Sequence, residues 1–202
     1  MLNKFVYTGA LLLSTFSTNV FAFDAIEEFE AAWINPKYTH YEAPAANINE
    51  LLDKQTLTGT QLWDAEKRKA WDPMKYIPPA VIKGVSYEKS YPRTGEETFM
   101  RSSQQRSWLD PKVIVPVLEE VHVFEKLRKV IFLGRPADEP SGQPLFHVEH
   151  SVGGTEENPL SLWRIIMLTP DKQYVNSVEK LFTQRSKSLP LFVQKYLEHD
   201  VK

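Results

Sequence analysis

The sequence predicts one exported domain of the α+β class: N-terminal short helices, a five- to six-stranded, mostly antiparallel sheet, and a long kinked C-terminal helix packed on it. Three observations predict this fold. Apolar residues recur at helical spacing before residue 72, segments rich in β-branched and aromatic residues follow at 80–169, and helical spacing returns after residue 177. Strands that follow one another without helices between them pair antiparallel, and such a sheet buries one face unless the other is covered. The C-terminal helix is the expected cover.

The N-terminal third contains short helices separated by prolines. Residues 23–33 place Ile26, Phe29 and Trp33 on one helical face. Asp24 is suited to cap the first turn of that helix. The expected segments that follow are an irregular stretch at 37–46, a helix capped by Asn47 or Asn49 that runs through Leu52, a break at 58–60, and a helix at 61–71.

Extended segments separated by turn residues fill the middle of the chain. They are expected at 80–91, 98–109, 113–115, 120–124, 127–133, 145–152 and 160–169. The first two form a hairpin about a turn at 92–95. The stretch 113–124 is divided into two because Pro116 has no N–H to donate to a sheet.

The C-terminal region returns to a helical pattern. Its apolar stripe, at spacings of three and four, is Val178, Leu181, Phe182, Leu189, Phe192, Val193, Tyr196 and Leu197. Pro190 interrupts the stripe, which predicts either two helices or one kinked helix. Ser188 would cap the second piece, with Pro190 in its first turn.

Residues 1–22 predict export. Lys4 supplies a positive n-region, residues 5–13 form a short apolar core, and residues 20–22 fit a signal peptidase site with the cut after Ala22. The apolar run is too short to cross about 30 Å of hydrocarbon. We therefore expect a signal peptide at 1–22, a single globular domain at 23–202, and a periplasmic or secreted location.

Composition narrows the range of partners. The formal net charge is −2 and the sequence has no long run of Lys or Arg, so nucleic acid is not an expected partner. The chain contains no cysteine, which excludes disulfides and thiolate chemistry. After signal cleavage, no apolar run is long enough for an integral membrane segment. A cysteine-free, soluble protein is the expectation.

Two histidines and a glutamate form the densest group of potential metal ligands. In an extended segment His147 and Glu149 point to one face, about 7 Å apart. His122 would complete a two-histidine, one-carboxylate metal site if its strand lies close by and presents it on the same face. The alternative is a polar strand face on which these side chains point to solvent. The sequence leaves both interpretations open.

Aromatic residues supply the other candidate site. The set that would line a pocket for an apolar molecule is Trp63, Trp71, Tyr76, Trp108, Trp163 and Phe182. The same residues also suit an ordinary packed core. Three arginines lie in or near expected strands, namely Arg101, Arg106 and Arg164. If they point inward they need a counter-charge, from Glu88, Glu97 or a ligand carboxylate.

The order of elements over about residues 60–200 resembles a helix-grip domain of the START type. In that arrangement a curved sheet wraps a long C-terminal helix around an apolar cavity. A cystatin-like α+β fold fits the same order of elements nearly as well.

Three functions are compatible with these features. The sequence contains no Gly-x-Ser-x-Gly elbow, Walker A loop or Rossmann fingerprint. We therefore expect an exported soluble binding or carrier protein for an apolar or amphipathic, lipid-like small molecule, and the sequence names no cofactor. One alternative is a metal-dependent or acid/base enzyme that uses His122, His147 and Glu149. The other is an interaction subunit of a cell-envelope complex, which an exposed apolar patch would favour.

Overall fold

The computed structural model describes residues 24–52, 55–78, 80–107, 109–135, 145–170 and 172–201. The expected signal peptide lies outside these residues. Within them, no helix combines the length and the apolar composition needed to cross a membrane.

The described chain is built around one antiparallel sheet of eight strands in the order β1-β8-β7-β6-β5-β4-β3, with β2 also paired to β8. The strands are β1 (Thr39–Glu42), β2 (Ala46–Asn47), β3 (Val81–Arg93), β4 (Glu96–Arg106), β5 (Ile114–Phe124), β6 (Lys129–Arg135), β7 (Phe146–Gly154) and β8 (Pro159–Met167). This confirms an α+β fold with a large antiparallel sheet. The sheet is larger than the five or six strands expected, because β1 and β2 join it.

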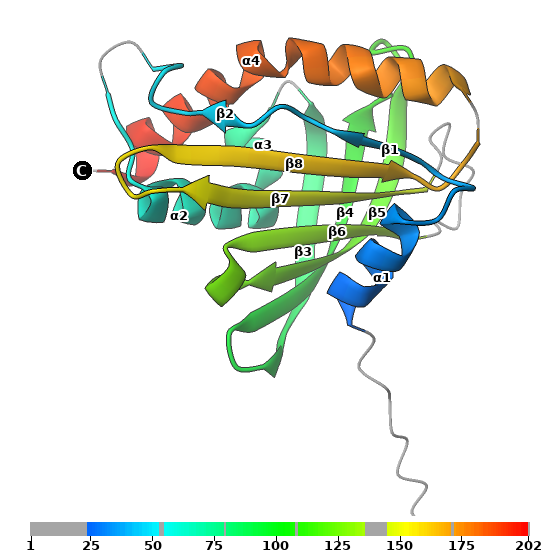
Figure 1. Cartoon of the computed structure of the whole chain (residues 1–202), viewed down its shortest axis with the longest axis horizontal. Helices are drawn as coiled ribbons and strands as arrows, with labels where there is room; N and C mark the ends of the chain where they lie inside the picture. The colour runs from blue at the N-terminus through cyan, green and yellow to red at the C-terminus, as the bar shows by residue number, and fades with distance from the viewer. Residues whose placement is uncertain are drawn as a thin grey trace, which may run out of the picture.

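Helices cover both faces of this sheet. They are α1 (Ala25–Trp33), α2 (Gly59–Trp71), α3 (Pro73–Tyr76) and α4 (Lys172–Asp200), with a short 3-10 turn η1 (Glu125–Leu127) before β6. The face covered by α2, α3 and α4 is called the inner face, and the face that α1 covers in part is called the outer face. Figure 1 shows β7 and β8 crossing the direction of β3, β4 and β5, with α4 along one side of the curved sheet and α1 apart from the other helices.

Alternation along each strand supplies apolar side chains to both faces. On β6, Phe132 points to the inner face and packs in the main core with Trp63 of α2 and Phe192 of α4. Its neighbour Ile131 points to the outer face and packs with Phe29 of α1. Because β6 is covered on both sides, its central residues are all buried.

The first helix forms as predicted. Asp24 caps α1, since its side chain accepts a hydrogen bond of 3.0 Å from the N–H of Ile26, and the helix ends at Trp33. The expected break at 58–60 is wrong, because Thr58 is the N-cap of α2. Thr58 and Gln61 form a reciprocal capping box, so the helix begins at Gly59.

The expected helix capped by Asn47 or Asn49 is absent from the described residues. Asn47 instead accepts a hydrogen bond from the N–H of Asn49, and the Asn49 amide exchanges two hydrogen bonds with Leu57. These asparagines therefore stabilise a loop rather than a helix. The stretch 37–46 is not irregular, since it contributes β1 and the start of β2 along the edge of β8.

Two prolines are accommodated where the sequence predicted breaks. Pro116 lies inside the continuous strand β5, opposite Gln104 of β4. The pairing of β5 with β6 starts at Leu118, so at Pro116 a missing N–H on that side costs no ladder bond. Helix α4 is a single helix through Pro190, and Ser188 lies within it rather than at a cap. The packing of the Leu189, Phe192, Val193 and Tyr196 stripe outweighs the hydrogen bond lost at Pro190.

Candidate functional site

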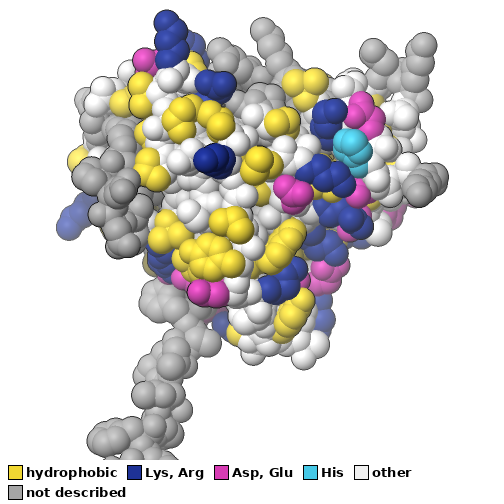
Figure 2. Space-filling view, turned by 180° about the vertical axis from the view of Figure 1, so that it is seen from behind, with side chains coloured by type: hydrophobic (Ala, Val, Ile, Leu, Met, Phe, Trp, Pro, Cys, Tyr) yellow, Lys and Arg dark blue, Asp and Glu magenta, His cyan; other side chains and the backbone are white. Residues whose placement is uncertain are grey.

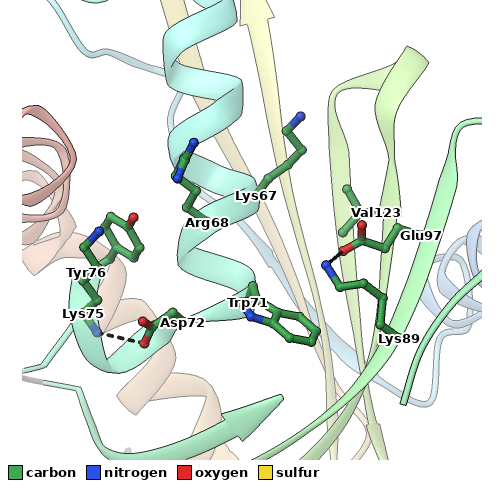
Figure 3. Close-up of a pocket in the computed structure, with 9 residues that line it drawn as sticks. All are labelled: Lys67, Arg68, Trp71, Asp72, Lys75, Tyr76, Lys89, Glu97 and Val123. Carbon is green, nitrogen blue, oxygen red and sulfur yellow. Dashed lines mark hydrogen bonds and ion pairs between the residues drawn. The ribbon is translucent and has the colours of Figure 1, made fainter. Parts of the chain in front are cut away.

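A pocket of about 360 Å³ opens where the C-terminal end of α2 meets α3 and the strands β3, β4 and β5. Its lining residues are Lys67, Arg68, Trp71, Asp72, Lys75, Tyr76, Lys89, Glu97 and Val123. Figure 3 shows Trp71 between α2 and the strands that carry Lys89 and Glu97. Arg68, Lys75 and Tyr76 lie on the other side of α2.

A sharp turn between α2 and α3 brings these side chains together. Asp72 ends α2 and also begins α3, where its side chain accepts a hydrogen bond from the N–H of Lys75. Pro73 occupies the first position of α3, where its fixed φ favours the new helix. As a result Trp71, Lys75 and Tyr76, close neighbours in sequence, face different parts of one pocket.

Trp71 is the aromatic surface of the pocket. Its side chain is 36% exposed, although the edge of its ring meets Phe99 with centroids 4.9 Å apart. The ammonium of Lys89 lies 4.0 Å from the centre of the Trp71 ring and 2.7 Å from a carboxylate oxygen of Glu97. Lys89 is thus held between an aromatic face and a carboxylate.

Asp200, near the end of α4, organises the opposite side. Its carboxylate accepts hydrogen bonds from the Tyr76 hydroxyl (2.7 Å), from Lys75 (3.2 Å) and from Arg68 (3.3 Å). Burial acts to raise the pKa of Asp200, but the bonds from Tyr76 and Lys75 hold that pKa below 3.8. Burial raises the pKa of the Tyr76 hydroxyl, and the bond to Asp200 adds to this shift. Tyr76 therefore stays a neutral donor.

Two of the six predicted aromatic residues, Trp71 and Tyr76, line this pocket. Trp63 is buried in the main core beside it and donates a hydrogen bond of 2.9 Å to Glu125. Trp163 is on the inner face, where it stacks on His150 at 4.1 Å. Trp108 lies outside the described residues. Phe182 belongs to α4, and the structure does not describe its side chain. The structure therefore brings together part of the predicted set.

The three predicted metal ligands share one face, as that prediction required. Ile131 of β6 lies in register between His122 of β5 and Glu149 of β7, and His147 lies on the same face as Glu149. All three side chains are buried, so the solvent-facing interpretation is wrong. Figure 1 shows α1 over this region.

Each of these three side chains contacts its own set of charged protein side chains. His122 contacts Glu96 and Glu120, and His147 lies 3.3 Å from Glu28. Glu149 pairs with Lys129 and Arg164, each at 2.7 Å. Within the part of the chain that the structure describes, no group of three or more His, Asp or Glu side chains is arranged to hold a metal ion.

The ionic groups of the inner face were not predicted from the sequence. Arg101 points inward and therefore needs a counter-charge. Glu119 supplies it at 2.7 Å, instead of the expected Glu88 or Glu97. On α2, buried Glu66 contacts both Lys69 and His150. Glu66 and Lys69 look like an exposed helical pair in sequence, and only the packing of α2 on the sheet buries them.

The two other arginines take different roles. Arg164 is on the outer face, between Glu149 and Glu30 of α1. Arg106 donates a hydrogen bond of 2.9 Å to the carbonyl of Pro111. Neither requires a ligand carboxylate.

Neither a protein-family model nor a curated protein sequence matches this chain. Solved structures do match it. The aromatase/cyclase Zhui from Streptomyces sp. R1128 is 10% identical with a TM-score of 0.52, and the match covers 81% of this chain and 97% of that one. A second match is the structure of Ara h 8.0201, which is 11% identical with a TM-score of 0.51 and covers 78% of this chain and 98% of that one.

A third match is the di-domain ARO/CYC StfQ from the steffimycin biosynthetic pathway. It is 11% identical with a TM-score of 0.55, and the match covers 87% of this chain but 56% of that one. At such identities the likeness shows the fold alone. The chain therefore has the helix-grip arrangement that the order of its elements resembled.

Proposed function

We propose that this chain is an exported binding protein for a small amphipathic molecule, which it holds in the pocket beside Trp71. The observation that carries the proposal is a half-exposed indole in a pocket of about 360 Å³ whose other walls are mostly polar. An apolar surface with a few convergent polar groups is what a ligand site offers. The fold supports the proposal, because two of its structural neighbours are named aromatase/cyclases and one of these belongs to a biosynthetic pathway.

Native mass spectrometry of protein purified from a periplasmic fraction tests the binding function. The wild type is expected to carry a small molecule that solvent extraction releases. Trp71→Ala should lose that molecule, and Trp33→Ala should keep it, because Trp33 lies on α1 at the outer face. A molecule retained in full by Trp71→Ala would place the ligand elsewhere and contradict the proposed site.

The same preparation tests export. The denatured mass is expected to correspond to a chain that begins at Phe23, after a cut at Ala22. Full-length protein confined to the cytoplasm would contradict the proposed location without affecting the pocket.

The edge strand β3 favours a second candidate, an interaction subunit of a cell-envelope complex. Its apolar side chains are unusually exposed for an edge, with Val85 at 58% and Tyr91 at 69%. Figure 2 shows hydrophobic side chains gathered on the side of the molecule opposite to that of Figure 1. The occupant expected here is an extended strand of a partner protein that pairs with the open edge of β3.

A photo-crosslinking residue at Val85, introduced in the exporting cell, tests the second candidate. One discrete crosslinked protein is expected if β3 binds a partner strand. A crosslinker at Lys37 is the control, because Lys37 lies just before β1, at the opposite end of the strand order from β3. Equal crosslinking from both positions, or none from Val85, would contradict it.

A further inference from the structure

The pocket is lined by more cations than carboxylates. Its cations are Lys67, Arg68, Lys75 and Lys89, and its carboxylates are Asp72 and Glu97. The four cationic side chains are between 33% and 48% exposed, so their charged ends reach the pocket. Asp72 also accepts a hydrogen bond from the first turn of α3, which takes up part of its acceptor capacity.

The carboxylates that pair with these cations leave donors free for a ligand. Asp200 is 10% exposed and pairs with Lys75 and Arg68, and Arg68 also pairs with Asp64 at 2.8 Å. Lysine has three N–H donors and arginine five, so one carboxylate does not use them all. At the rim, Lys67 pairs with exposed Glu125, and such an exposed pair is worth only about 0–1 kcal/mol. The acid group of a ligand could therefore replace Glu125 as the partner of Lys67 at little cost in free energy.

The place that a ligand cation would take is already filled by the chain itself. The Lys89 ammonium lies over the Trp71 ring and against Glu97. A cationic ligand would need to displace Lys89 from both contacts. An anion, in contrast, needs no such displacement, because it can accept hydrogen bonds from the ammonium donors of Lys89 that Glu97 does not use.

Resting on the proposed function, we infer that the pocket binds an amphipathic anion, a molecule with one carboxylate, sulfonate or phosphate group on an aromatic or aliphatic body. The acid group accepts hydrogen bonds from Lys67 and Lys89, and the body lies against Trp71 and Val123. Figure 3 shows Lys67 on α2 and Lys89 on β3 at opposite walls of the space beside Trp71.

Two fluorescent probes that share one ring system separate charge from apolar contact. Anilinonaphthalene sulfonate carries a sulfonate, and N-phenyl-naphthylamine is the same skeleton without it. The purified full chain is expected to bind the sulfonate about tenfold more tightly, the effect of one charge-assisted hydrogen bond at a half-exposed site. That preference should shrink as salt is added, because ions screen exposed charges.

Variants locate the effect. Lys67→Gln and Lys89→Gln should each weaken sulfonate binding several-fold and change binding of the neutral probe much less, because that probe has no acid group for the lysines to bind. Lys67→Arg keeps the positive charge and should bind the sulfonate probe as tightly as the wild type does. Lys195→Gln is the control, because Lys195 is also partly exposed, at 42%, and pairs with an exposed glutamate, but lies on α4 outside the pocket. Trp71→Ala should weaken both probes.

The outcomes distinguish the two proposals. Equal affinity for both probes, with no effect of Lys67→Gln or Lys89→Gln, would overturn the anion inference, while a loss of both probes in Trp71→Ala would still support the pocket. If Trp71→Ala changes neither probe, the proposed site fails and the inference fails with it. Selective loss of the sulfonate probe in the two lysine variants supports the inference.

Discussion

At the scale of single residues, a buried histidine on the outer face joins two carboxylates. His122 lies 3.1 Å from Glu96 and 2.8 Å from Glu120, and its ring stacks on Phe124. Burial acts to lower the pKa of His122, but the hydrogen bonds to Glu120 and Glu96 raise that pKa above 6.5. The bond to His122 is the main reason why the pKa of Glu120 falls to about 2. Each group thus favours the charged form of the other.

This pair predicts how stability depends on pH. A raised folded-state pKa means that the stabilisation by His122 is fully present below pH 6.5 and is lost as the pH rises through the folded pKa. Glu120 stabilises above pH 4.5 and loses this effect as the pH falls toward 2. The pair therefore contributes most between pH 4.5 and 6.5. Further charged groups on the surrounding elements α1, β3 and β6 are Glu28, Arg93 and Arg135.

Urea unfolding at two pH values tests this dependence. His122→Gln should lower the free energy of unfolding by more at about pH 6 than at about pH 9, because the stabilisation by the wild-type imidazolium is lost as the pH rises. His147 is the internal contrast, since burial lowers its pKa and the folded chain therefore favours its neutral form. His147→Gln should therefore relieve a penalty at low pH instead of creating one. A loss in His122→Gln that is equal at both pH values would show that His122 acts only through packing.

The candidate site was predictable from sequence only in part, for reasons visible in its residues. Trp71 and Tyr76 were predicted as pocket residues because bulky aromatics in a proline-punctuated region suggest a binding surface. Lys89 and Asp200 were not predicted. Asp200 depends on a contact with Tyr76, more than a hundred positions away, and Lys89 of β3 depends on a contact with Trp71 at the end of α2. Charged residues at exposed helical or strand positions carry no local sign of such partners.

At the scale of elements, α1 is attached to the outer face by its apolar side and by charged residues at several points. Phe29 is fully buried against β6 and β8. Glu28 pairs with Arg135, Glu30 with Arg164, and the capping residue Asp24 with Arg93 of β3. Asp24 thus both starts the helix and links it to the sheet.

Substitution of the cap tests this double role. Asp24→Ala should lower the free energy of unfolding by about 1 kcal/mol or slightly more, because it removes the N-cap bond and an exposed ion pair. Glu27→Ala, at an exposed position of the same turn, is the control and should change stability by less than about 0.5 kcal/mol. Chemical denaturation measures both, and hydrogen exchange of the α1 amides shows where the effect lies. Equal losses in the two variants would contradict the capping role.

Elements defined by local sequence were predicted well, and elements defined by distant partners were not. The start of α1 follows from Asp24, and the β3–β4 hairpin follows from turn residues ending at Gly95, whose φ is +84°. Strands β1 and β2 were missed because they form on β8, more than a hundred residues later in the chain. Similarly, the local sequence does not reveal that Pro116 lies before the part of β5 that pairs with β6, where a proline can be tolerated.

At the scale of the whole molecule, the two layers meet across buried charges as well as apolar side chains. Glu66 and Lys69 of α2 lie against the inner face of the sheet, where Glu66 contacts His150 and the Lys69 ammonium lies 4.4 Å from the Phe192 ring of α4. Burial acts to raise the pKa of Glu66, but Lys69 and His150 lower it to about 2. One ionic group thus connects helix, sheet and C-terminal helix.

Removing one partner should be far more costly than removing both. Lys69→Met leaves the Glu66 charge buried beside His150 alone, and is expected to lower the free energy of unfolding by about 3–5 kcal/mol. The double variant Glu66→Leu/Lys69→Met replaces the pair with apolar side chains of similar size, and should recover most of that loss. Urea denaturation of the wild type, both single variants and the double variant gives the coupling energy.

The acid side of the pH profile gives a second, independent check on this ionic group. Because the folded-state pKa of Glu66 is depressed to about 2, its stabilisation is present above pH 4.5 and is lost as the pH falls toward 2. The double variant lacks this group, so its stability should fall less steeply between pH 4.5 and 2 than that of the wild type. If the two profiles run parallel, folding does not lower the pKa of Glu66. The contact between α2 and the sheet would then be mainly apolar. Any loss of unfolding free energy in Lys69→Met would reflect lost packing.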